Sequence, residues 1–492
     1  MSTLFVVGEV ERAEVTRALD ALAGVCDRRV QVADLPGLFV RLYSDRLAGS
    51  RWNYEEGVSV VVHAGGSAES RELDATFRAF LPVFNLVALE QRAAAARLPE
   101  LLRELPAQNA ACRDRIRRMA HWMYYGGSGS CSSRVYSIVR QLRATGEPRS
   151  AARAIPSAVE AVDFVSLLAG ATRGGEPRYW RLLSTWGFQP HSLGAAELVY
   201  CAFVLLRKLS ADAGVGLSDN RLLLFLFTLE ASYHQVNKFH NFRHAVDVMQ
   251  ATWRLCENII DDRLQVLLLS MAAIGHDIGH PGSNNMLLTK FGAPVATAYG
   301  ESVLENMHKD FFQQLLKSQW PQLLGLSQSL CKGESQYNLI AETILATDMA
   351  LHAEYVDKLK ENHRIDNLKM LTSLIIKAAD ISNVTRPLAI SAQWAYLITL
   401  EFRDCSLLEE YQAKGDGGQS APQDEESGHT NSGRLLSPDE LVDKYPCIPG
   451  GQIFFIDTFA EQFFKEFCQK FPELNFLIDN VQSNKKFWLE KL

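Results

Sequence analysis

Helical periodicity over nearly the whole C-terminal part of the chain is the feature that most restricts its fold. From residue 195 onward, apolar residues recur every three or four positions, with almost none of the alternation that marks a strand. This part of the chain is therefore expected to form packed helices. We predict helices over residues 195–209, 219–233, 244–258, 263–273, 339–359, 368–380 and 453–470.

The first 105 residues follow a different pattern, in which short β-rich runs alternate with amphipathic helical runs. Strands are predicted at 3–8, 29–33, 57–63 and 85–89, and helices at 10–23, 36–47 and 67–80. Such alternation is typical of βα units around a parallel sheet, and it indicates a small flavodoxin-like or receiver-like module. A single glycine, Gly8, follows the first strand instead of a glycine-rich phosphate loop, so we favour a folding or interaction module.

Together these patterns predict a multidomain chain. An α/β module spans residues 1–105, a helical linker region 106–180 and an all-α domain 181–492. Glycine-rich breaks at 126–133 and 172–177 interrupt the linker region, and we interpret them as flexible connections. A polar insert at 414–434 predicts a surface loop within the all-α domain.

Composition and charge exclude several classes of protein. Apolar residues make up 47% of the 492 residues and charged residues 22%, which is typical of a folded globular chain and not of a disordered or fibrous one. The chain has 50 Lys and Arg against 57 Asp and Glu, a net charge of −7, and shows no basic stripe. A polymeric nucleic acid is therefore not expected as a partner, because its binding depends on neutralising phosphates.

Cysteine usage and hydropathy indicate the compartment. The nine cysteines are scattered and never form a C-x-x-C pair, which favours free thiols over a disulfide framework or a thiolate zinc site. The longest apolar runs are shorter than a bilayer span, and the N-terminal run lacks the basic flank of a secretory signal. We expect a cytoplasmic protein, with the nucleus as the alternative, and no membrane span.

Histidines are concentrated in one stretch of the all-α domain. Five of the twelve lie between positions 234 and 280, far more than an even spread would give. Histidine is the commonest metal ligand and titrates near neutral pH, so chemistry is expected there. The five are His234, His240, His244, His276 and His280.

Three short motifs extend this histidine cluster into a ligand set. His240 and His244 are four residues apart, a spacing that places two side chains on one face of a helix or its first turn. A His-Asp pair at 276–277 and the distant Asp380 add a nitrogen and two carboxylates. One histidine, the His-Asp pair and Asp380 together give an N₂O₂ set without sulfur, which suits zinc, manganese or iron, and a bridging carboxylate can hold a second, harder ion such as magnesium.

These motifs resemble the His…His-Asp…Asp signature of the HD-type metal-dependent phosphohydrolases and, in more detail, the class I 3′,5′-cyclic-nucleotide phosphodiesterases. The resemblance covers roughly residues 181–492, where the matching stretches begin at His240, His276, Glu305, Ala346, Ala379 and Gln452. It implies an all-α catalytic domain that follows the α/β module.

The resemblance also implies two divalent metal ions in each catalytic domain, Zn²⁺ together with Mg²⁺ or Mn²⁺. Zinc would be held by His244, His276, Asp277 and Asp380, and Asp277 would bridge to the second ion. The residues that surround the ligands and their waters would be Glu305, Thr347, Asp348 and His280.

The implied reaction is hydrolysis of cyclic AMP to 5′-AMP, which lowers cyclic-AMP signalling. A hydroxide held between the metals would attack phosphorus, and His240 as imidazolium would protonate the departing 3′ oxygen. The Gln452 amide would bond the purine edge, while Phe455 and Ile398 would sandwich the ring; Asn383 and Trp394 are further pocket residues by the same match. Protein partners of the N-terminal module are not predicted.

Three alternatives remain open at this level. One is a phosphodiesterase acting on both cyclic AMP and cyclic GMP, since an amide can rotate to serve either base. The second is another HD-type nucleotide phosphohydrolase, and the third a nonenzymatic cyclic-nucleotide sensor. The chain also departs from the family pattern, with Phe239 before the first motif histidine and Met307-His308 where two histidines are common.

Overall fold

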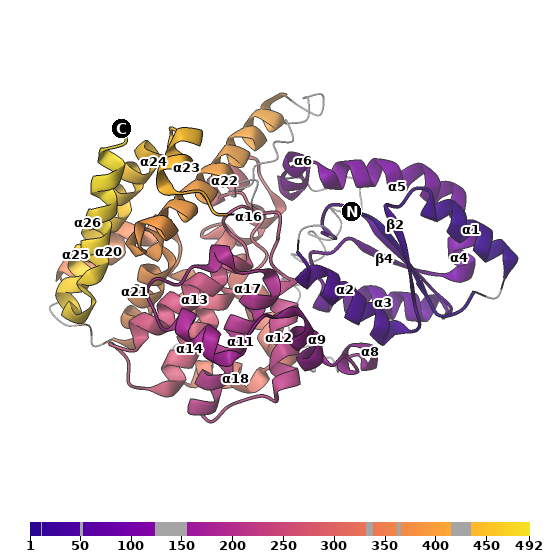
Figure 1. Cartoon of the computed structure of the whole chain (residues 1–492), viewed down its shortest axis with the longest axis horizontal. Helices are drawn as coiled ribbons and strands as arrows, with labels where there is room; N and C mark the ends of the chain where they lie inside the picture. The colour runs from indigo at the N-terminus through magenta and orange to yellow at the C-terminus, as the bar shows by residue number, and fades with distance from the viewer. Residues whose placement is uncertain are drawn as a thin grey trace.

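The computed structural model describes residues 1–10, 12–49, 53–123, 155–330, 338–361, 365, 367–414 and 434–492. The predicted flexible connection at 126–133 and nearly all of the 414–434 insert lie outside these residues. Figure 1 shows two parts, a sheet with its covering helices at the N-terminal end and a larger helical body. In the described part of the chain, no helix combines the length and apolar character needed to cross a bilayer.

The N-terminal part is built on a parallel sheet of four strands, in the order β2-β1-β3-β4. This order is that of the first four strands of a flavodoxin-like sheet. The predicted α/β fold is therefore confirmed, with strand positions within a few residues of those expected. The strands are β1 (Thr3–Val7), β2 (Arg28–Val32), β3 (Ser59–His63) and β4 (Leu86–Glu90).

Alternation along β1 explains why helices cover both faces of the sheet. Leu4 and Val6 contribute to the core beneath one face, whereas Phe5 and Val7 contribute to the core on the other. The first core includes residues of α1 (Ala13–Ala23), α4 (Gln91–Ala96) and α5 (Leu98–Arg113), and the second includes residues of α2 (Leu35–Leu47) and α3 (Ser67–Phe80).

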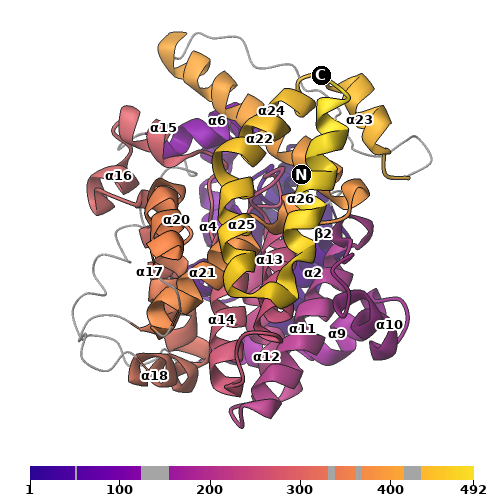
Figure 2. The same cartoon turned by 90° about the vertical axis from the view of Figure 1, so that its left-hand side faces the viewer.

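The rest of the described chain is helical, as predicted. Helices α13, α14, α19 and α21 pack together at its centre, and in Figure 2 α22, α25 and α26 lie toward the viewer. The helices are α6 (Arg115–Ala120), η2 (His121–Met123), α8 (Ser157–Glu160), α9 (Phe164–Ala171), α10 (Glu176–Leu183), η3 (Pro190–Ser192), α11 (Ala195–Asp212), α12 (Asp219–Glu230), α13 (Phe242–Cys256), α14 (Arg263–Gly275), α15 (Asn285–Lys290), α16 (Pro294–Tyr299), α17 (Val303–Gln319), α18 (Pro321–Ser329), α19 (Leu339–Leu345), η4 (Met349–Leu351), α20 (His352–Glu361), α21 (Leu368–Asp380), η5 (Ser382–Thr385), α22 (Leu388–Lys414), α23 (Pro438–Lys444), α24 (Ile448–Phe455), η6 (Ile456–Ala460), α25 (Glu461–Lys470), η7 (Pro472–Leu474) and α26 (Phe476–Leu489).

One predicted helix, over residues 339–359, is wrong because the chain breaks between α19 and α20. Asp348 starts a new turn there, and its side chain accepts a hydrogen bond from the backbone nitrogen of Ala350 at 2.8 Å. The predicted helix over 453–470 is continuous in direction but contains a wide π-type turn, η6. Both irregularities lie beside residues that the sequence assigns to the site.

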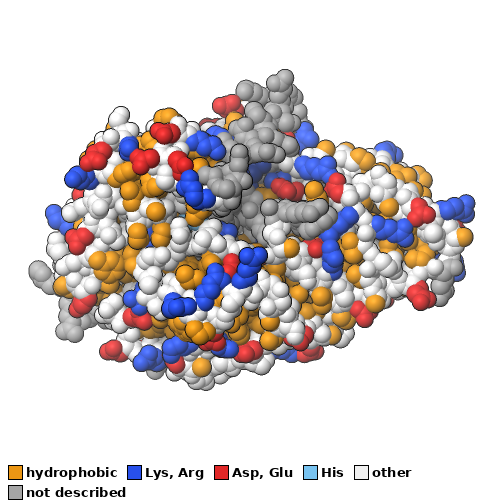
Figure 3. Space-filling view, viewed as in Figure 1, with side chains coloured by type: hydrophobic (Ala, Val, Ile, Leu, Met, Phe, Trp, Pro, Cys, Tyr) orange, Lys and Arg blue, Asp and Glu red, His pale blue; other side chains and the backbone are white. Residues whose placement is uncertain are grey.

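Surface charge is mixed over both parts of the molecule. Acidic and basic side chains are interspersed on the face shown in Figure 3. The cysteines within the described residues are all free thiols, as expected.

A buried ion-pair network joins the two parts. Arg46, near the end of α2, is only 1% exposed, and its Nε lies 2.9 Å from Oε1 of Glu230 at the end of α12. Its Nη1 lies 3.1 Å from Oε1 of Glu55, and its Nη2 donates to the carbonyl oxygen of Tyr233 at 2.7 Å. One guanidinium thereby ties the N-terminal part to the segment that follows α12.

We predict that Arg46→Met lowers the free energy of unfolding by about 3–5 kcal/mol, because the buried Glu230 carboxylate loses its cation. Urea unfolding followed by circular dichroism measures the change. Arg29→Met is the control, since it removes only an exposed pair with Asp20 and should change stability little. Equal effects of the two substitutions would contradict the assignment.

Candidate metal centre

The four residues predicted as metal ligands meet at one point in the helical part. His244 comes from the first turn of α13, His276 and Asp277 follow α14, and Asp380 ends α21. Nε2 of His244 and Nε2 of His276 each lie 3.2 Å from Oδ1 of Asp380. Nε2 of His276 is also 3.2 Å from Oδ2 of Asp277, and all four residues are buried or nearly so.

These separations fit ligands that share one ion. Two ligand atoms about 2.0–2.1 Å from a zinc ion lie about 3.0–3.4 Å apart in tetrahedral or octahedral geometry. His276 is also prepared for this use, since its Nδ1 bonds the carbonyl oxygen of Ala273 at 2.7 Å, while its Nε2 is buried without a hydrogen-bond partner. The Nδ1 bond fixes the orientation of the ring, with Nε2 facing the two carboxylates, where a metal ion could take the place of its proton.

The charges of the cluster balance one another. Burial alone would raise the pKa of Asp277 and of Asp380, but the adjacent His276 outweighs it and holds the pKa of both carboxyl groups below the usual range. The two carboxylates are therefore ionised, which is the state that a divalent cation requires.

His240 lies just before α13 instead of within it, because Asn241 caps the helix and α13 starts at Phe242. Its ring centre is 5.9 Å from that of His244, so the four-residue spacing places both rings at one site, as predicted. The ring also stacks on His280, with centroids 4.1 Å apart.

Glu401 is a partner of His240 that the sequence did not identify. It comes from α22, accepts a hydrogen bond from Nδ1 of His240, and accepts another from the backbone nitrogen of Phe239 at 2.8 Å. Burial lowers the pKa of His240, but the Glu401 carboxylate outweighs it and raises the pKa to about 9. Because 161 residues separate Glu401 from His240, no local sequence motif links the two. The one signal that could have identified Glu401 is a carboxylate on a buried face of α22.

A second group of possible ligands adjoins the first. Asp277, His280 and His308 have ligand atoms within 4.8 Å of one another. Nε2 of His308 lies 3.7 Å from Oδ1 of Asp277 and has no hydrogen-bond partner, while its Nδ1 bonds the carbonyl oxygen of Ile278 at 2.7 Å. Asp277 thus presents one carboxylate oxygen to each group.

Two further acidic side chains stand near the cluster. Burial, together with the nearby Asp348 carboxylate, raises the pKa of Glu305 to about 7. Oδ2 of Asp348 accepts a hydrogen bond from Ser302 at 2.6 Å, and Asn285 donates to Glu305 at 3.0 Å. The hydroxyl of Thr347 donates to the carbonyl oxygen of Ile344 in its own turn.

Comparison with known proteins agrees with this geometry. The sequence model of the 3′5′-cyclic nucleotide phosphodiesterase family matches residues 239–415. The chain is 43% identical to 3′,5′-cyclic-nucleotide phosphodiesterase 2 of Saccharomyces cerevisiae, over 100% of this chain and 99% of that protein. The chain belongs to this phosphodiesterase family.

Two other relatives extend the comparison. The probable 3′,5′-cyclic phosphodiesterase pde-6 of Caenorhabditis elegans is 31% identical over 56% of this chain and 35% of its own length. The crystal structure of yeast caPDE2 in complex with IBMX superposes with a TM-score of 0.77 at 26% identity and covers 100% of both chains. The likeness to the yeast proteins therefore includes the N-terminal part of this phosphodiesterase.

The residues predicted to hold the base lie on two helices of the phosphodiesterase that pack together. Gln452 and Phe455 are on α24, and Trp394 and Ile398 are on α22. Oε1 of Gln452 is buried without a hydrogen-bond partner, and the Phe455 ring packs against Phe459 with centroids 5.5 Å apart.

Trp394 is fully buried and lies beside the histidines of the site. Its ring centre is 5.7 Å from that of His244 and 5.3 Å from that of Phe239. Asn383 is buried in η5, directly after the turn that begins at Asp380.

Gly275, the residue before His276, packs closely against a neighbouring side chain, so a larger residue there tests the packing of the cluster. A Cβ at Gly275 would lie 2.4 Å from the ring of Phe312, which is itself fully buried. We predict that Gly275→Ala moves the end of α14, lowers the free energy of unfolding by about 1–3 kcal/mol and reduces the divalent metal retained after dialysis.

Gly325→Ala in α18 is the matched control, because a Cβ there meets nothing within 4 Å. It should raise the free energy of unfolding by about 0.4–1 kcal/mol and leave the retained metal unchanged. Denaturant unfolding and elemental analysis measure the two effects, and full metal retention in Gly275→Ala would contradict the expectation.

Proposed function

We propose that the chain hydrolyses 3′,5′-cyclic AMP to 5′-AMP and thereby lowers cyclic-AMP signalling. The observation that carries the proposal is the convergence of two histidines and two carboxylates at ligand spacing, with His240 beside them. A cyclic phosphodiester is a compact anion, and this site offers cation ligands and one proton donor around a single point.

We assign Zn²⁺ to the group formed by His244, His276, Asp277 and Asp380. Asp277, with the neighbouring His280 and His308, would also help to hold a second ion, Mg²⁺ or Mn²⁺, which favours carboxylate and water oxygens. The carboxylates of Glu305 and Asp348 are suited to accept hydrogen bonds from those waters. When bound, the two ions supply positive charge to the phosphoryl oxygens and lower the pKa of water at the site.

His240 is the proton donor to the departing 3′ oxygen in this proposal. Its Nδ1 is engaged by Glu401, which leaves Nε2 to face the substrate. Because the Glu401 carboxylate keeps the pKa near 9, the ring is an imidazolium at neutral pH and can transfer the proton. Glu401 acts through His240 and is a positioning residue.

The base is held by Gln452, with Phe455 and Ile398 on the two faces of the ring. The buried Oε1 of Gln452 suits the exocyclic amine of adenine, and the amide nitrogen suits a ring nitrogen. Asn383 and Trp394 complete the wall of the pocket.

The preference for cyclic AMP follows one of the relatives. The human 3′,5′-cyclic phosphodiesterase 8A, named as high affinity and cAMP-specific, is 27% identical over 62% of this chain, whereas the human rod cGMP-specific phosphodiesterase subunit alpha is 24% identical over the same share. A dual cyclic AMP and cyclic GMP phosphodiesterase is the second candidate, since among the described residues no hydrogen bond fixes the Gln452 amide. Another HD-type phosphohydrolase or a nonenzymatic sensor has less support, because the ligand set and the acid are complete.

The decisive assay measures hydrolysis of cyclic AMP and cyclic GMP with and without a chelator. We predict that chelation abolishes turnover, and that Asp277→Asn does the same while the fold is retained, because the bridging carboxylate is lost. Asp261→Asn, an exposed residue before α14, is the control and should retain full activity. Retained hydrolysis of both nucleotides by Asp277→Asn would sink the proposed mechanism.

Glu401→Gln should lower kcat/KM by roughly 10- to 100-fold while bound zinc is retained. The imidazolium form of His240 is needed, so the rate falls as pH rises through its pKa, which is about 9 in the native protein. Removal of the carboxylate lowers that pKa, and the alkaline limb of the pH profile should therefore move to lower pH. An unchanged limb would show that Glu401 does not set the ionisation of His240.

A further inference from the structure

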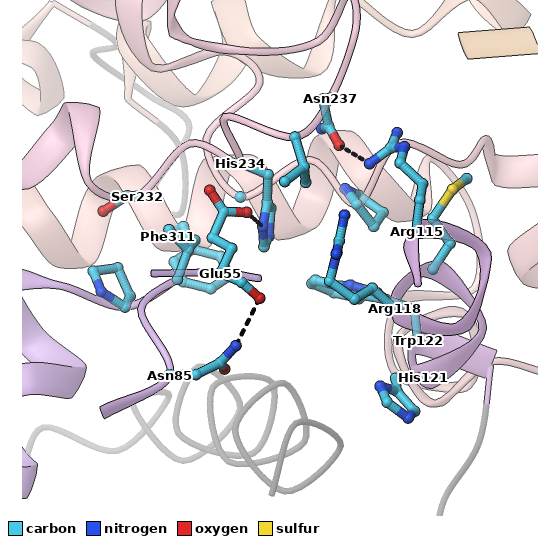
Figure 4. Close-up of a pocket in the computed structure, with 16 residues that line it drawn as sticks. Glu55, Asn85, Arg115, Arg118, His121, Trp122, Ser232, His234, Asn237 and Phe311 are labelled. Atoms are coloured by element: carbon cyan, nitrogen blue, oxygen red, sulfur yellow. Dashed lines mark hydrogen bonds and ion pairs between the residues drawn. The ribbon is translucent and has the colours of Figure 1, made fainter. Parts of the chain in front are cut away.

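A pocket opens where the N-terminal part meets the helical part, behind the metal centre. Its walls come from three regions of the chain, as Figure 4 shows: Glu55 and Asn85 from the N-terminal part, Arg115 and Arg118 from α6, and His234 and Asn237 from the segment between α12 and α13. Pro281 and Gly279, which follow Asp277, also line it. Apart from Glu55, which belongs to the Arg46 network, none of these residues has been assigned a role so far.

Arg118 is the unusual side chain in this pocket. Its guanidinium carries five N–H donors, yet among the described residues its one hydrogen bond is to the carbonyl oxygen of Cys112, and its Nε is buried without a partner. It forms no ion pair with a described carboxylate. Arg118 is only partly exposed, and a cation largely withdrawn from water without a counter-ion is costly, so an anionic ligand would stabilise it.

Arg115 adds a second guanidinium to the same pocket. Its Nε lies 2.7 Å from Oδ2 of Asp404, and its Nη2 is buried without a hydrogen-bond partner. Burial lowers the pKa of Arg118, and the like charge of Arg115 lowers it further, while Glu55 and Glu56 act in the opposite direction. The pocket thus holds two neighbouring cations with unused donors.

The buried carboxylate at the pocket edge is already satisfied. Glu55 pairs with Arg46 and with Nδ1 of His234 at 2.8 Å, and it accepts a hydrogen bond from the backbone nitrogen of Gln235 at 2.8 Å. It is therefore engaged away from Arg118. An anionic ligand would supply the partner that Arg118 lacks among the described residues.

We infer that this pocket binds a phosphate group, held by Arg115 and Arg118. Guanidinium forks match the geometry of phosphate oxygens and are weakly hydrated, which suits a buried site. The ligand is either free inorganic phosphate or a small phosphate monoester, and the recognised chemistry is the same in both.

Occupancy of the pocket is coupled to the position of His240 by direct contacts. Nη1 of Arg115 donates to Oδ1 of Asn237 at 3.2 Å, and Nδ2 of Asn237 donates to the carbonyl oxygens of His240 at 2.8 Å and His280 at 2.7 Å. Asp404, the other partner of Arg115, lies one turn after Glu401 on α22. An anion that attracts the Arg115 guanidinium would change its contacts with Asn237 and Asp404, which lie on the two sides of His240. The pocket would then act as a regulatory site.

The binding test uses the metal-loaded full chain, with inorganic phosphate and glycerol 3-phosphate each titrated by isothermal calorimetry. We expect a binding event that is lost in Arg118→Gln and kept in Arg29→Gln, an exposed arginine on β2. Binding of both probes identifies the phosphate group as the recognised element, and binding of one identifies the source. Equal stoichiometry in the wild type and Arg118→Gln would overturn the inference, because the metal centre would then account for all binding.

Thermal unfolding gives a second, independent measurement. Phosphate should raise the Tm of the wild type above that in chloride of equal ionic strength, but the increase should be smaller in Arg118→Gln. Arg118→Lys keeps a cation without the planar fork and should bind phosphate at least about 10-fold more weakly. An equal Tm increase in the wild type and both variants would overturn the inference even if one variant folded poorly.

The kinetic consequence rests on the proposed function. Phosphate bound at Arg118 should change kcat for cyclic AMP, an effect that is absent in Arg118→Gln, whereas phosphate at the metal centre competes with substrate and changes KM in both proteins. A chain without hydrolytic activity would leave the calorimetric result intact, so failure of the proposed function is distinguishable from failure of this site.

Discussion

The structure depends on keeping Asp277 and Asp380 ionised inside the protein. The carboxylate of Asp277 is buried and that of Asp380 is largely shielded at a helix end, where an isolated charge would be expensive, and His244 and His276 are the groups that compensate them. This requirement explains why α13, α14 and α21 converge with little freedom, and why the residue before His276 is a glycine packed against Phe312. The ionised carboxylates of the site and the close packing of these helices therefore depend on each other.

Much of this arrangement was predictable from the sequence, because the information is local. Apolar spacing predicted the helices, the four-residue spacing of His240 and His244 placed both rings at one site, and adjacency placed His276 and Asp277 together at the end of α14. The break between α19 and α20 was missed, since apolar periodicity continues across residues 346–348 and only the side chain of Asp348 ends the pattern. A capping aspartate inside an apolar repeat is a weak signal beside the repeat itself.

Contacts between distant segments could not be predicted in the same way. Glu401 reaches His240 across 161 residues, and Arg46 reaches Glu230 across 184, and no motif marks Glu401, Arg46 or Glu230. A buried charged residue is recognisable only once its surroundings are known. In the sequence, a helical Glu or Arg that will be buried looks the same as one that will be exposed. Such residues are nevertheless the ones that set the pKa of His240 and fix the N-terminal part.

The segment between α12 and α13 connects these observations. Arg46 bonds the carbonyl oxygen of Tyr233, Glu55 bonds His234, and Asn237 bonds the carbonyl oxygen of His240, so most of the segment is held by contacts from outside it. Two of the three contacts come from the N-terminal part, although His240 itself faces the metal centre. The N-terminal part is thus connected through hydrogen bonds to the segment that carries His240, the proposed proton donor. The likeness to yeast caPDE2 over 100% of both chains extends through this α/β module.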